Sequence, residues 1–359
     1  MNNELTKEHT KIAKGCAIIF MIILHLFAHD EWLYENNGYT TIFNIGGTSI
    51  DVIVSSFGKI CVAMYLFLSG YGLYKTYIVN KGFTYKDSYI RIKNLYINYI
   101  LILIIFIPIG YALGVYKEPL TIYRFLINIF CLDFYYNSFA WFIRLYFILV
   151  LMFPFLVKIL DKSLIKNMII IVTLAITHII LNKVQFEINY WDINLIGNLG
   201  VISEVNSIVL WSIHFIIGIT YAKFNLYTFI KEKLKSLSLD NKMFYTFCFI
   251  VCIFLRNMLP YKEILDGLYA PLTIMSISNI IYKSKSENIF KYLGEHSTNL
   301  WLIHFYFTYK YFQSIIYYPK YTILILICSF IIMIPISICI NKVLKMTKLS
   351  LGKRLALEK

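Results

Sequence analysis

Long apolar segments with almost no charge recur along the whole chain and leave little choice of fold. Ten of these segments approach the roughly 20 mostly apolar residues that a helix needs to cross a bilayer. They explain why 59% of the residues are hydrophobic and only 15% are charged. We therefore predict an all-α fold, a polytopic transmembrane helix bundle that forms one domain over residues 1–359. The ten predicted helices cover residues 12–28, 60–78, 95–115, 139–157, 166–182, 208–223, 243–259, 264–282, 298–316 and 321–343.

The basic residues between these segments indicate which way the helices run. Of the 34 Lys and Arg residues, 25 fall on the side of the N-terminus, eight fall on the opposite side, and Arg144 lies inside a predicted helix. Cytoplasmic loops carry the excess of Lys and Arg, so both chain ends are expected in the cytoplasm. The two longest outer loops, residues 29–59 and 183–207, carry acidic residues instead. These are Asp30, Glu31, Glu35, Asp51, Glu187, Asp192 and Glu204.

The net charge of +14 follows this loop pattern and does not indicate a nucleic-acid partner. No basic stretch interleaved with aromatic residues stands apart from a predicted helix. The seven Cys residues form no CxxC pair and no metal-ligand spacing, so we expect neither a disulfide nor a metal site. The first apolar segment lacks a small-x-small cleavage site and is interrupted by His25. We therefore expect an uncleaved helix and a multi-pass protein of the plasma membrane, with the lipid bilayer as its partner.

Two polar residues share one face of the first predicted helix. Lys14 and His25 are eleven residues apart, which is nearly three helical turns and about 16 Å. Lys14 is expected at the cytoplasmic interface, where a cation can hold phosphates. His25 is expected near the midplane, where an imidazole can act as a general base toward a hydroxyl. Alternatively, Lys14 only anchors the helix and His25 packs against another helix through one hydrogen bond.

Few other predicted helices carry such groups. Ser69 and Gly70 are small enough for close ligand approach, although plain helix packing explains them as well. Trp141 fits an outer aromatic belt, and Arg144, about one turn deeper, could bind an acceptor or extend outward to the interface. By depth, Ser69 and His304 belong to the inner half of the membrane, between the levels of Lys14 and His25.

Taken in order, these residues resemble the hallmarks of acyltransferase family 3, membrane proteins that O-acylate cell-wall and extracellular saccharides. The family begins with a basic residue, ten intervening residues and a His, which Lys14 and His25 match, with Lys in place of the commoner Arg. Further resembling elements follow over about 290 residues. They are Phe67 to Gly70, Arg91-Ile92-Lys93, Trp141-Phe142, Pro154, Leu293-Gly294 with Ser297, and Leu302-Ile303-His304.

The resemblance implies an acyl-CoA donor, most simply acetyl-CoA, as a substrate and not as a tightly bound cofactor. CoA is anionic, so it should enter from the cytoplasm through a mouth lined by basic residues. The acyl group would pass to a saccharide or cell-envelope glycan, either directly or through a partner acyl-transfer protein. The implied site residues are the catalytic His25, the donor-binding Lys14, Arg91, Lys93, Ser69 and His304, and the acceptor-binding Trp141 and Arg144.

Two other classes of function stay open on the sequence. A transporter or flippase of a polysaccharide or lipid-linked saccharide would also suit ten helices and a midplane His. However, the sequence shows no inverted repeat and no paired helices broken by Gly or Pro. A membrane sensor or scaffold would need none of these polar groups. The sequence does not identify the acceptor or the length of the acyl group.

Overall fold

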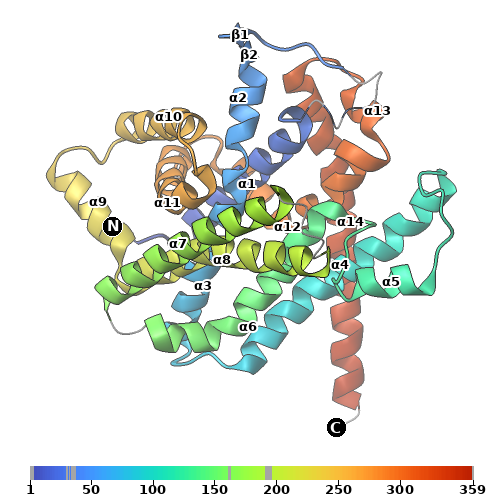
Figure 1. Ribbon diagram of the computed structural model, residues 1–359, viewed down its shortest axis with the longest axis horizontal. Helices are drawn as coiled ribbons and strands as arrows, with labels where there is room; N and C mark the ends of the chain where they lie inside the picture. The colour runs from blue at the N-terminus through green and yellow to red at the C-terminus, as the bar shows by residue number, and fades with distance from the viewer. Residues whose placement is uncertain are drawn as a thin grey trace. The chain divides into compact units, whose positions relative to one another are not determined.

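The computed structural model describes residues 4–29, 31, 33, 38–160, 163–190 and 196–357, without the side chains of residues 45, 188–190, 196–199 and 347–357. The predicted outer-loop residues Asp30, Glu35 and Asp192 lie outside the described residues. Most of the described residues are helical (Figure 1). The helices are α1 (Lys7–Phe27), α2 (Ile50–Phe57), α3 (Ile60–Val79), α4 (Tyr85–Ala112), α5 (Ile122–Ile129), α6 (Phe142–Leu160), α7 (Leu164–Tyr190), α8 (Ile196–Lys223), α9 (Leu226–Ser236), α10 (Lys242–Met258), α11 (Lys262–Ile281), α12 (Glu287–Phe305), α13 (Gln313–Tyr317) and α14 (Thr322–Leu357).

Three kinds of short element complete the described chain. A 3₁₀-helix, η2 (Ser138–Trp141), leads directly into α6. A π-helix, η3 (Tyr306–Lys310), follows α12 directly. Strands β1 (Asn44–Ile45) and β2 (Thr48–Ser49) pair antiparallel ahead of α2.

The predicted all-α, polytopic fold is confirmed. Eight helical stretches among the described residues are long and apolar enough to cross a membrane, and they coincide with eight of the ten predicted helices. The predicted helix at residues 243–259 is α10, which has 17 residues. The eight stretches are Lys7–Phe27, Ile50–Val79, Tyr85–Ala112, Ser138–Leu160, Leu164–Glu187, Gly200–Lys223, Lys262–Ile281 and Thr322–Met346.

The structure differs from the prediction most clearly at residues 298–316. Helix α12 begins earlier, at Glu287, and ends at Phe305, where the backbone changes to the π-helix η3. The charged residues Glu287, Lys291 and Glu295 had suggested a loop. Glu and Lys are nevertheless good helix formers, and Lys291 pairs with carboxylates on both α12 and α1. The charged stretch is therefore helical.

The chain forms two compact units, and each is assembled from discontinuous segments. Unit 1 comprises Met1–Ala17, Ile60–Tyr89 and Leu145–Lys291, and unit 2 comprises Ile18–Lys59, Ile90–Arg144 and Tyr292–Lys359. Helices α1, α4, α6 and α12 each contribute residues to both units.

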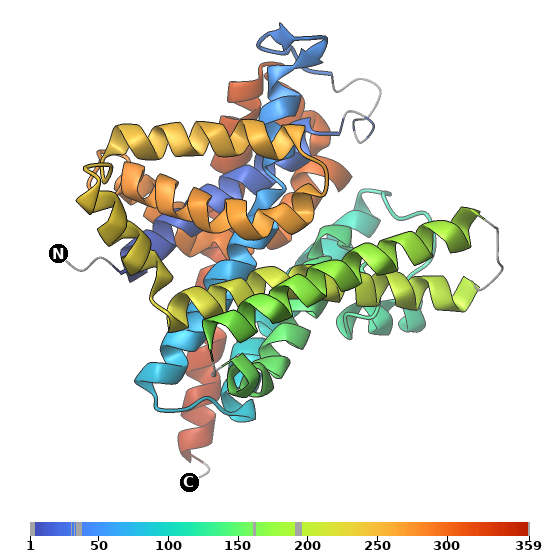
Figure 2. The ribbon, with the colours of Figure 1, turned by 60° about the vertical axis from the view of Figure 1, so that its left-hand side comes forward.

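Unit 1 contains a close crossing of α3 and α8. A Cβ added to Gly70 would lie 2.1 Å from the backbone oxygen of Phe215, and one added to Gly218 would lie 2.1 Å from that of Phe67. Only glycine at both positions allows the two backbones to approach this closely. Helix α7 runs antiparallel to α8 (Figure 2), and Asn167 Nδ2 donates to Thr220 Oγ1 at 3.1 Å between them.

A buried ion pair joins α10 to α11 in the same unit. Arg256 Nε donates to Asp266 Oδ1 at 2.6 Å, and Arg256 Nη2 donates to Asp266 Oδ2 at 2.8 Å. The two side chains are only 1% and 0% exposed. His214 of α8 lies 2.9 Å from the backbone oxygen of Glu263 through Nε2. Polar contacts thus connect α11 to both α10 and α8 in unit 1.

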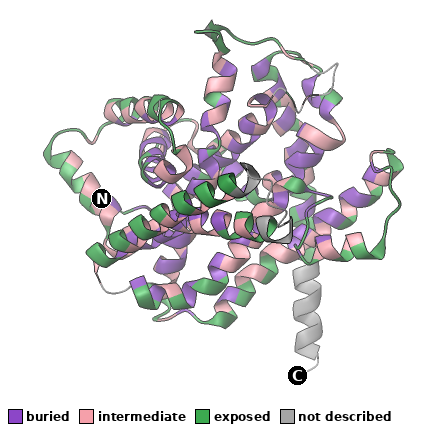
Figure 3. Ribbon diagram, viewed as in Figure 1, coloured by how far each residue is buried: buried purple, intermediate pink, exposed green. Residues whose placement is uncertain are grey.

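Hydrogen bonds from asparagine side chains join α4, α12 and α14 in unit 2. Asn98 Nδ2 of α4 donates to Asn299 Oδ1 of α12 at 2.6 Å. Asn299 Nδ2 in turn donates to the backbone oxygen of Ser337 of α14 at 3.1 Å. Figure 3 shows how buried residues gather on the packed faces of the helices, whereas exposed residues dominate α7. In α7 only 11% of the apolar span is buried, so this helix offers most of its surface to lipid.

Candidate active site

His25, Phe139 and His304 meet within unit 2. His25 is on the last turn of α1, Phe139 is on η2, and His304 is on the last turn of α12. The Phe139 ring stacks on both imidazoles, with centroid distances of 4.0 Å to His25 and 5.2 Å to His304. The centroids of the two imidazoles are 4.9 Å apart. The structure therefore brings together two residues that the sequence places 279 positions apart.

The tautomer of His304 follows from its hydrogen bond. Its Nδ1 contacts the backbone oxygen of Trp301, and because a carbonyl can only accept, Nδ1 carries the proton. In the neutral ring the lone pair is then on Nε2. His304 is fully buried, and Nε2 has no hydrogen-bond partner in the described part of the chain. This nitrogen is thus available to accept a proton or a hydrogen bond.

The segment that carries Phe139 is fixed to α12. Trp301 Nε1 donates to the backbone oxygen of Phe139 at 3.1 Å, and Asn137 Nδ2 donates to that of Leu302 at 2.8 Å. Thr308 Oγ1, in the π-helix, donates to the backbone oxygen of His304 at 2.9 Å. The π-helix begins two residues after His304, and such segments are often found at functional sites.

The end of α1 that carries His25 is held by two tyrosines. The carbonyls of a last helical turn lack partners within the helix. Tyr317 donates its hydroxyl to the backbone oxygen of Leu26, and Tyr39 donates to that of Phe27 at 3.3 Å. Both bonds belong to unit 2, so His25 sits on a turn whose end is fixed there.

Comparison with known protein families decides the family. The family model of acyltransferase family 3, described as an acyltransferase domain, matches residues 11–342, nearly the whole chain. This chain belongs to acyltransferase family 3. It is therefore a multi-pass membrane acyltransferase. Neither the search of curated proteins nor that of solved structures found a match.

The first hallmark of the family lies within a single helix, since α1 contains both Lys14 and His25. Lys14 belongs to unit 1 and has an exposed side chain. Its backbone oxygen accepts a hydrogen bond from Tyr65 of α3 at 3.2 Å. Ser69 of α3 is linked to the same tyrosine, because its hydroxyl donates to the Tyr65 backbone oxygen at 2.7 Å. Unit 1 thus connects Lys14 and Ser69 through one residue.

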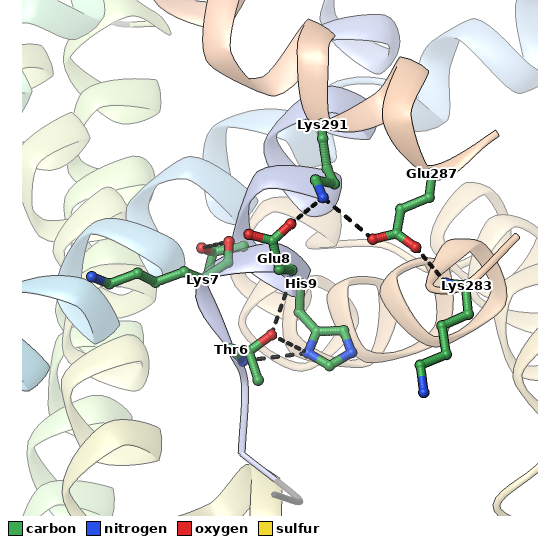
Figure 4. A network of polar contacts seen from close by, with 8 residues as sticks. Thr6, Lys7, Glu8, His9, Lys283, Glu287 and Lys291 are labelled. Atoms are coloured by element: carbon green, nitrogen blue, oxygen red, sulfur yellow. Dashed lines mark hydrogen bonds and ion pairs between the residues drawn. The ribbon is translucent and has the colours of Figure 1, made fainter. Parts of the chain in front are cut away.

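A polar network anchors the start of α1 to the start of α12 (Figure 4). Glu8 forms an ion pair with Lys291, whose Nζ also lies 3.5 Å from Glu287 Oε1. The packing beside it is tight, because a Cβ on Gly15 would lie 2.0 Å from the Phe290 backbone oxygen. In the sequence, Lys291 contributes only to the bias of basic residues toward the predicted cytoplasmic side. The contact could not be foreseen, since its partner lies at the other end of the chain.

The other predicted donor-binding cations lie in unit 2, near the start of α4. Arg91 is half-buried and Lys93 is exposed. Lys14 belongs to unit 1, so the joint role of these three cations at the entrance for the donor stays a prediction.

The two predicted acceptor-binding residues lie where η2 meets α6. Arg144 Nη1 donates to the backbone oxygens of Leu132 at 3.1 Å and Cys131 at 3.4 Å. Its guanidinium carbon also lies 5.3 Å from the centre of the Phe134 ring. Arg144 therefore braces the segment between α5 and η2, a role that neither sequence interpretation included. Trp141 is half-buried beside Phe142, with ring centroids 6.1 Å apart.

Sequence reasoning missed Phe139 and Asn137. An aromatic residue is unremarkable in a chain with 28 Phe and 30 Tyr. Asn137 offered a better signal, since a fully buried amide in an aromatic segment needs a specific partner.

Proposed function

We propose that this acyltransferase moves an acetyl group from acetyl-CoA to a hydroxyl of an extracytoplasmic or lipid-linked saccharide. The observation that carries the proposal is the contact of two imidazoles on Phe139, the half-buried His25 and the fully buried His304, whose Nε2 has no hydrogen-bond partner among the described residues. Transfer from a thioester to a hydroxyl needs a base at the oxygen and an acid at the sulfur. An imidazole can serve as both in turn.

In the proposed reaction His25 acts on the acceptor. It removes the proton as the hydroxyl oxygen forms its bond to the acetyl carbon, and the carbon–sulfur bond breaks. The proton then passes from His25 to the departing sulfur, so CoA leaves as a thiol and the ester remains on the saccharide. A positioned base of this kind contributes about 10²–10⁴-fold in rate.

His304 supports this step through its Nε2 lone pair. When His25 holds the proton, both of its ring nitrogens are donors. The ring centroids are 4.9 Å apart, so a side-chain rotation would bring the unpartnered Nε2 of His304 into hydrogen-bond contact with His25. Neutral His304 would accept from the protonated His25, much as an acceptor orients the histidine of a catalytic triad.

The donor and the acceptor would approach from opposite sides. The excess of basic residues predicts that α1 starts in the cytoplasm. There Lys14, Arg91 and Lys93 would each attract the phosphates of CoA. The extended arm of CoA separates its phosphates from its thioester, as one helix separates Lys14 from His25 by about 16 Å. The saccharide would arrive from the outer side of the plasma membrane near Trp141. Only the acetyl group would cross.

Oriented proteoliposomes test this proposal. Labelled acetyl-CoA is supplied on the cytoplasmic side, and short cell-wall oligosaccharides are supplied only on the outer side. We expect labelled ester on the saccharide and an equal amount of free CoA inside, both abolished by His25→Gln. Transport of the unmodified saccharide without release of CoA would contradict the proposal and favour a carrier.

A further inference from the structure

A cleft opens in unit 1 where α6 ends and α7 begins. Its volume is about 430 Å³, which is within the range of ligand-binding cavities. The lining residues come from the last turns of α6 and the first turns of α7. They are Phe155, Lys158, Ile159, Lys166, Ile169 and Ile170. None of them has a role in the acyl transfer proposed above.

The lining is graded from charged to apolar. Lys158 and Lys166 lie two residues from the end of α6 and from the start of α7, respectively. Phe155 and Ile169 lie about one turn further from the connecting loop. Two cations therefore flank the loop end of the cleft, and apolar side chains form the part that extends into the membrane-spanning helices.

The two ammonium groups are available to a ligand. Both side chains are exposed, and neither pairs with a carboxylate among the described residues. Residues 158–166 contain three Lys and one Asp, so the segment is net positive even with Asp161, which lies outside the described residues. The start of α7 is well anchored, because Lys166 N donates to Ser163 Oγ at 3.2 Å and the buried Asn167 bonds to α8.

This combination selects an amphiphilic anion. A small soluble anion would use the two lysines but leave the apolar walls in contact with water. A neutral lipid would use the walls but leave two cations without a partner. An anionic phospholipid satisfies both, and basic pockets between membrane helices on the cytoplasmic side bind such headgroups. The distribution of basic residues predicts that the end of α6 and the start of α7 face the cytoplasm.

We propose that this cleft is a binding site for an anionic phospholipid of the inner leaflet. Lys158 and Lys166 hold the phosphate, and the upper part of an acyl chain lies against Phe155 and Ile169. The bound lipid fills the space between α6 and α7, and α7 otherwise buries little of its own surface. The site is independent of the acyl transfer.

Native mass spectrometry of the full chain in neutral detergent tests the site. Titration with phosphatidylglycerol should show one copy retained at lower concentration than any copy of phosphatidylcholine. The double variant Lys158→Gln/Lys166→Gln should weaken the binding of this copy about 25-fold, given roughly fivefold for each basic residue near an anionic lipid. The matched control Lys233→Gln/Lys235→Gln removes two exposed lysines of α9, outside the cleft, and should leave it unchanged.

Two further measurements distinguish the sources of the anion. Phe155→Ser should weaken phosphatidylglycerol severalfold while both lysines remain, because the acyl chain loses its apolar wall. Glycerol phosphate, which has the anion but no chain, should not displace the lipid at equal concentration. The proposal is overturned if phosphatidylcholine binds equally well, if glycerol phosphate competes equally, or if both double variants behave alike.

Discussion

Two regions of this acyltransferase bury polar side chains among apolar helices, and they do so in opposite ways. In unit 1, Arg256 and Asp266 satisfy each other through two hydrogen bonds at 2.6 and 2.8 Å. In unit 2, His25 and His304 stack on Phe139, and Nε2 of His304 has no partner among the described residues. A buried polar group normally finds a partner, so unused bonding capacity calls for a ligand, a proton or a reacting atom.

This difference indicates that the ion pair serves stability and that the imidazoles serve catalysis. A complete ion pair resists change, because removing one partner leaves a buried charge that costs about 3–5 kcal/mol. A neutral imidazole packed on an aromatic ring costs far less to replace. Its substitution should remove activity and leave the fold in place. The following variants test this division, from the largest expected effect to the smallest.

The largest effect is expected at His25. His25→Gln keeps a hydrogen-bonding group but removes the base, so turnover should fall by about 10²–10⁴-fold. Release of CoA from labelled acetyl-CoA measures this loss, and thermal unfolding in detergent should be nearly unchanged. Turnover close to that of the parent protein would mean that His25 serves only in packing. The proposed difference between a catalytic imidazole and a stabilising ion pair would then be wrong.

The next effect concerns the ion pair itself. Arg256→Met removes the cationic partner of the buried Asp266 and should lower the free energy of unfolding by about 3–5 kcal/mol. Replacing both residues, in Arg256→Met/Asp266→Leu, should recover most of the loss, because no charge then stays buried. Denaturant titration in mixed micelles gives both values. A double variant as unstable as the single one would show that the pair has a role beyond mutual neutralisation.

A third pair of variants separates the two nitrogens of His304. His304→Asn can still donate to the Trp301 backbone oxygen but has nothing at the position of Nε2. His304→Gln places its amide near that position. If the Nε2 lone pair supports His25, the Asn variant should lose roughly 10–100-fold in kcat, a smaller share than the base itself, and the Gln variant should lose less. Equal losses of kcat in the two variants would mean that His304 acts through the stacking of its ring on Phe139 and not through Nε2.

The smallest effect is expected at the start of α1. Glu8 and Lys291 are 40% and 26% exposed, so solvent screens their ion pair and limits its contribution. Glu8→Lys should lower the melting temperature only slightly. The double reversal Glu8→Lys/Lys291→Glu should restore it, and added salt should reduce the difference. A large loss of stability in the single variant would show that this network stabilises the protein as strongly as the buried ion pair of unit 1.

The sequence predicted the fold, and it suggested His25 as the centre of the proposed site, for a simple reason. Membrane-spanning helices can be recognised from the hydropathy of the sequence, and a His within such a helix is rare enough to be noticed. The eleven-residue spacing of Lys14 and His25 is a property of one helix, so it needed no tertiary information. His304 was identified through a resemblance, and the structure then placed it beside His25.

What the sequence did not predict depends on contacts between distant segments. The stacking of Phe139 on two imidazoles is set by hydrogen bonds from Trp301 and Asn137 to backbone oxygens, which no local pattern encodes. The early start of α12 was missed because its charges find partners on α1. The ion pair of Arg256 and Asp266 could have been predicted, because opposite charges on the two sides of the loop between two helices suggest a pair.

The glycine crossing of α3 and α8 has a practical consequence for measuring motion. Gly70 and Gly218 each contact the backbone of the opposite helix so closely that a Cβ atom would collide with it. Neither helix can therefore slide along the other without a steric clash. The pair must travel as one body during a turnover cycle. Spectroscopic labels on exposed positions of α3 and α8 therefore give a fixed internal ruler, against which displacements of α1 or α12 can be read.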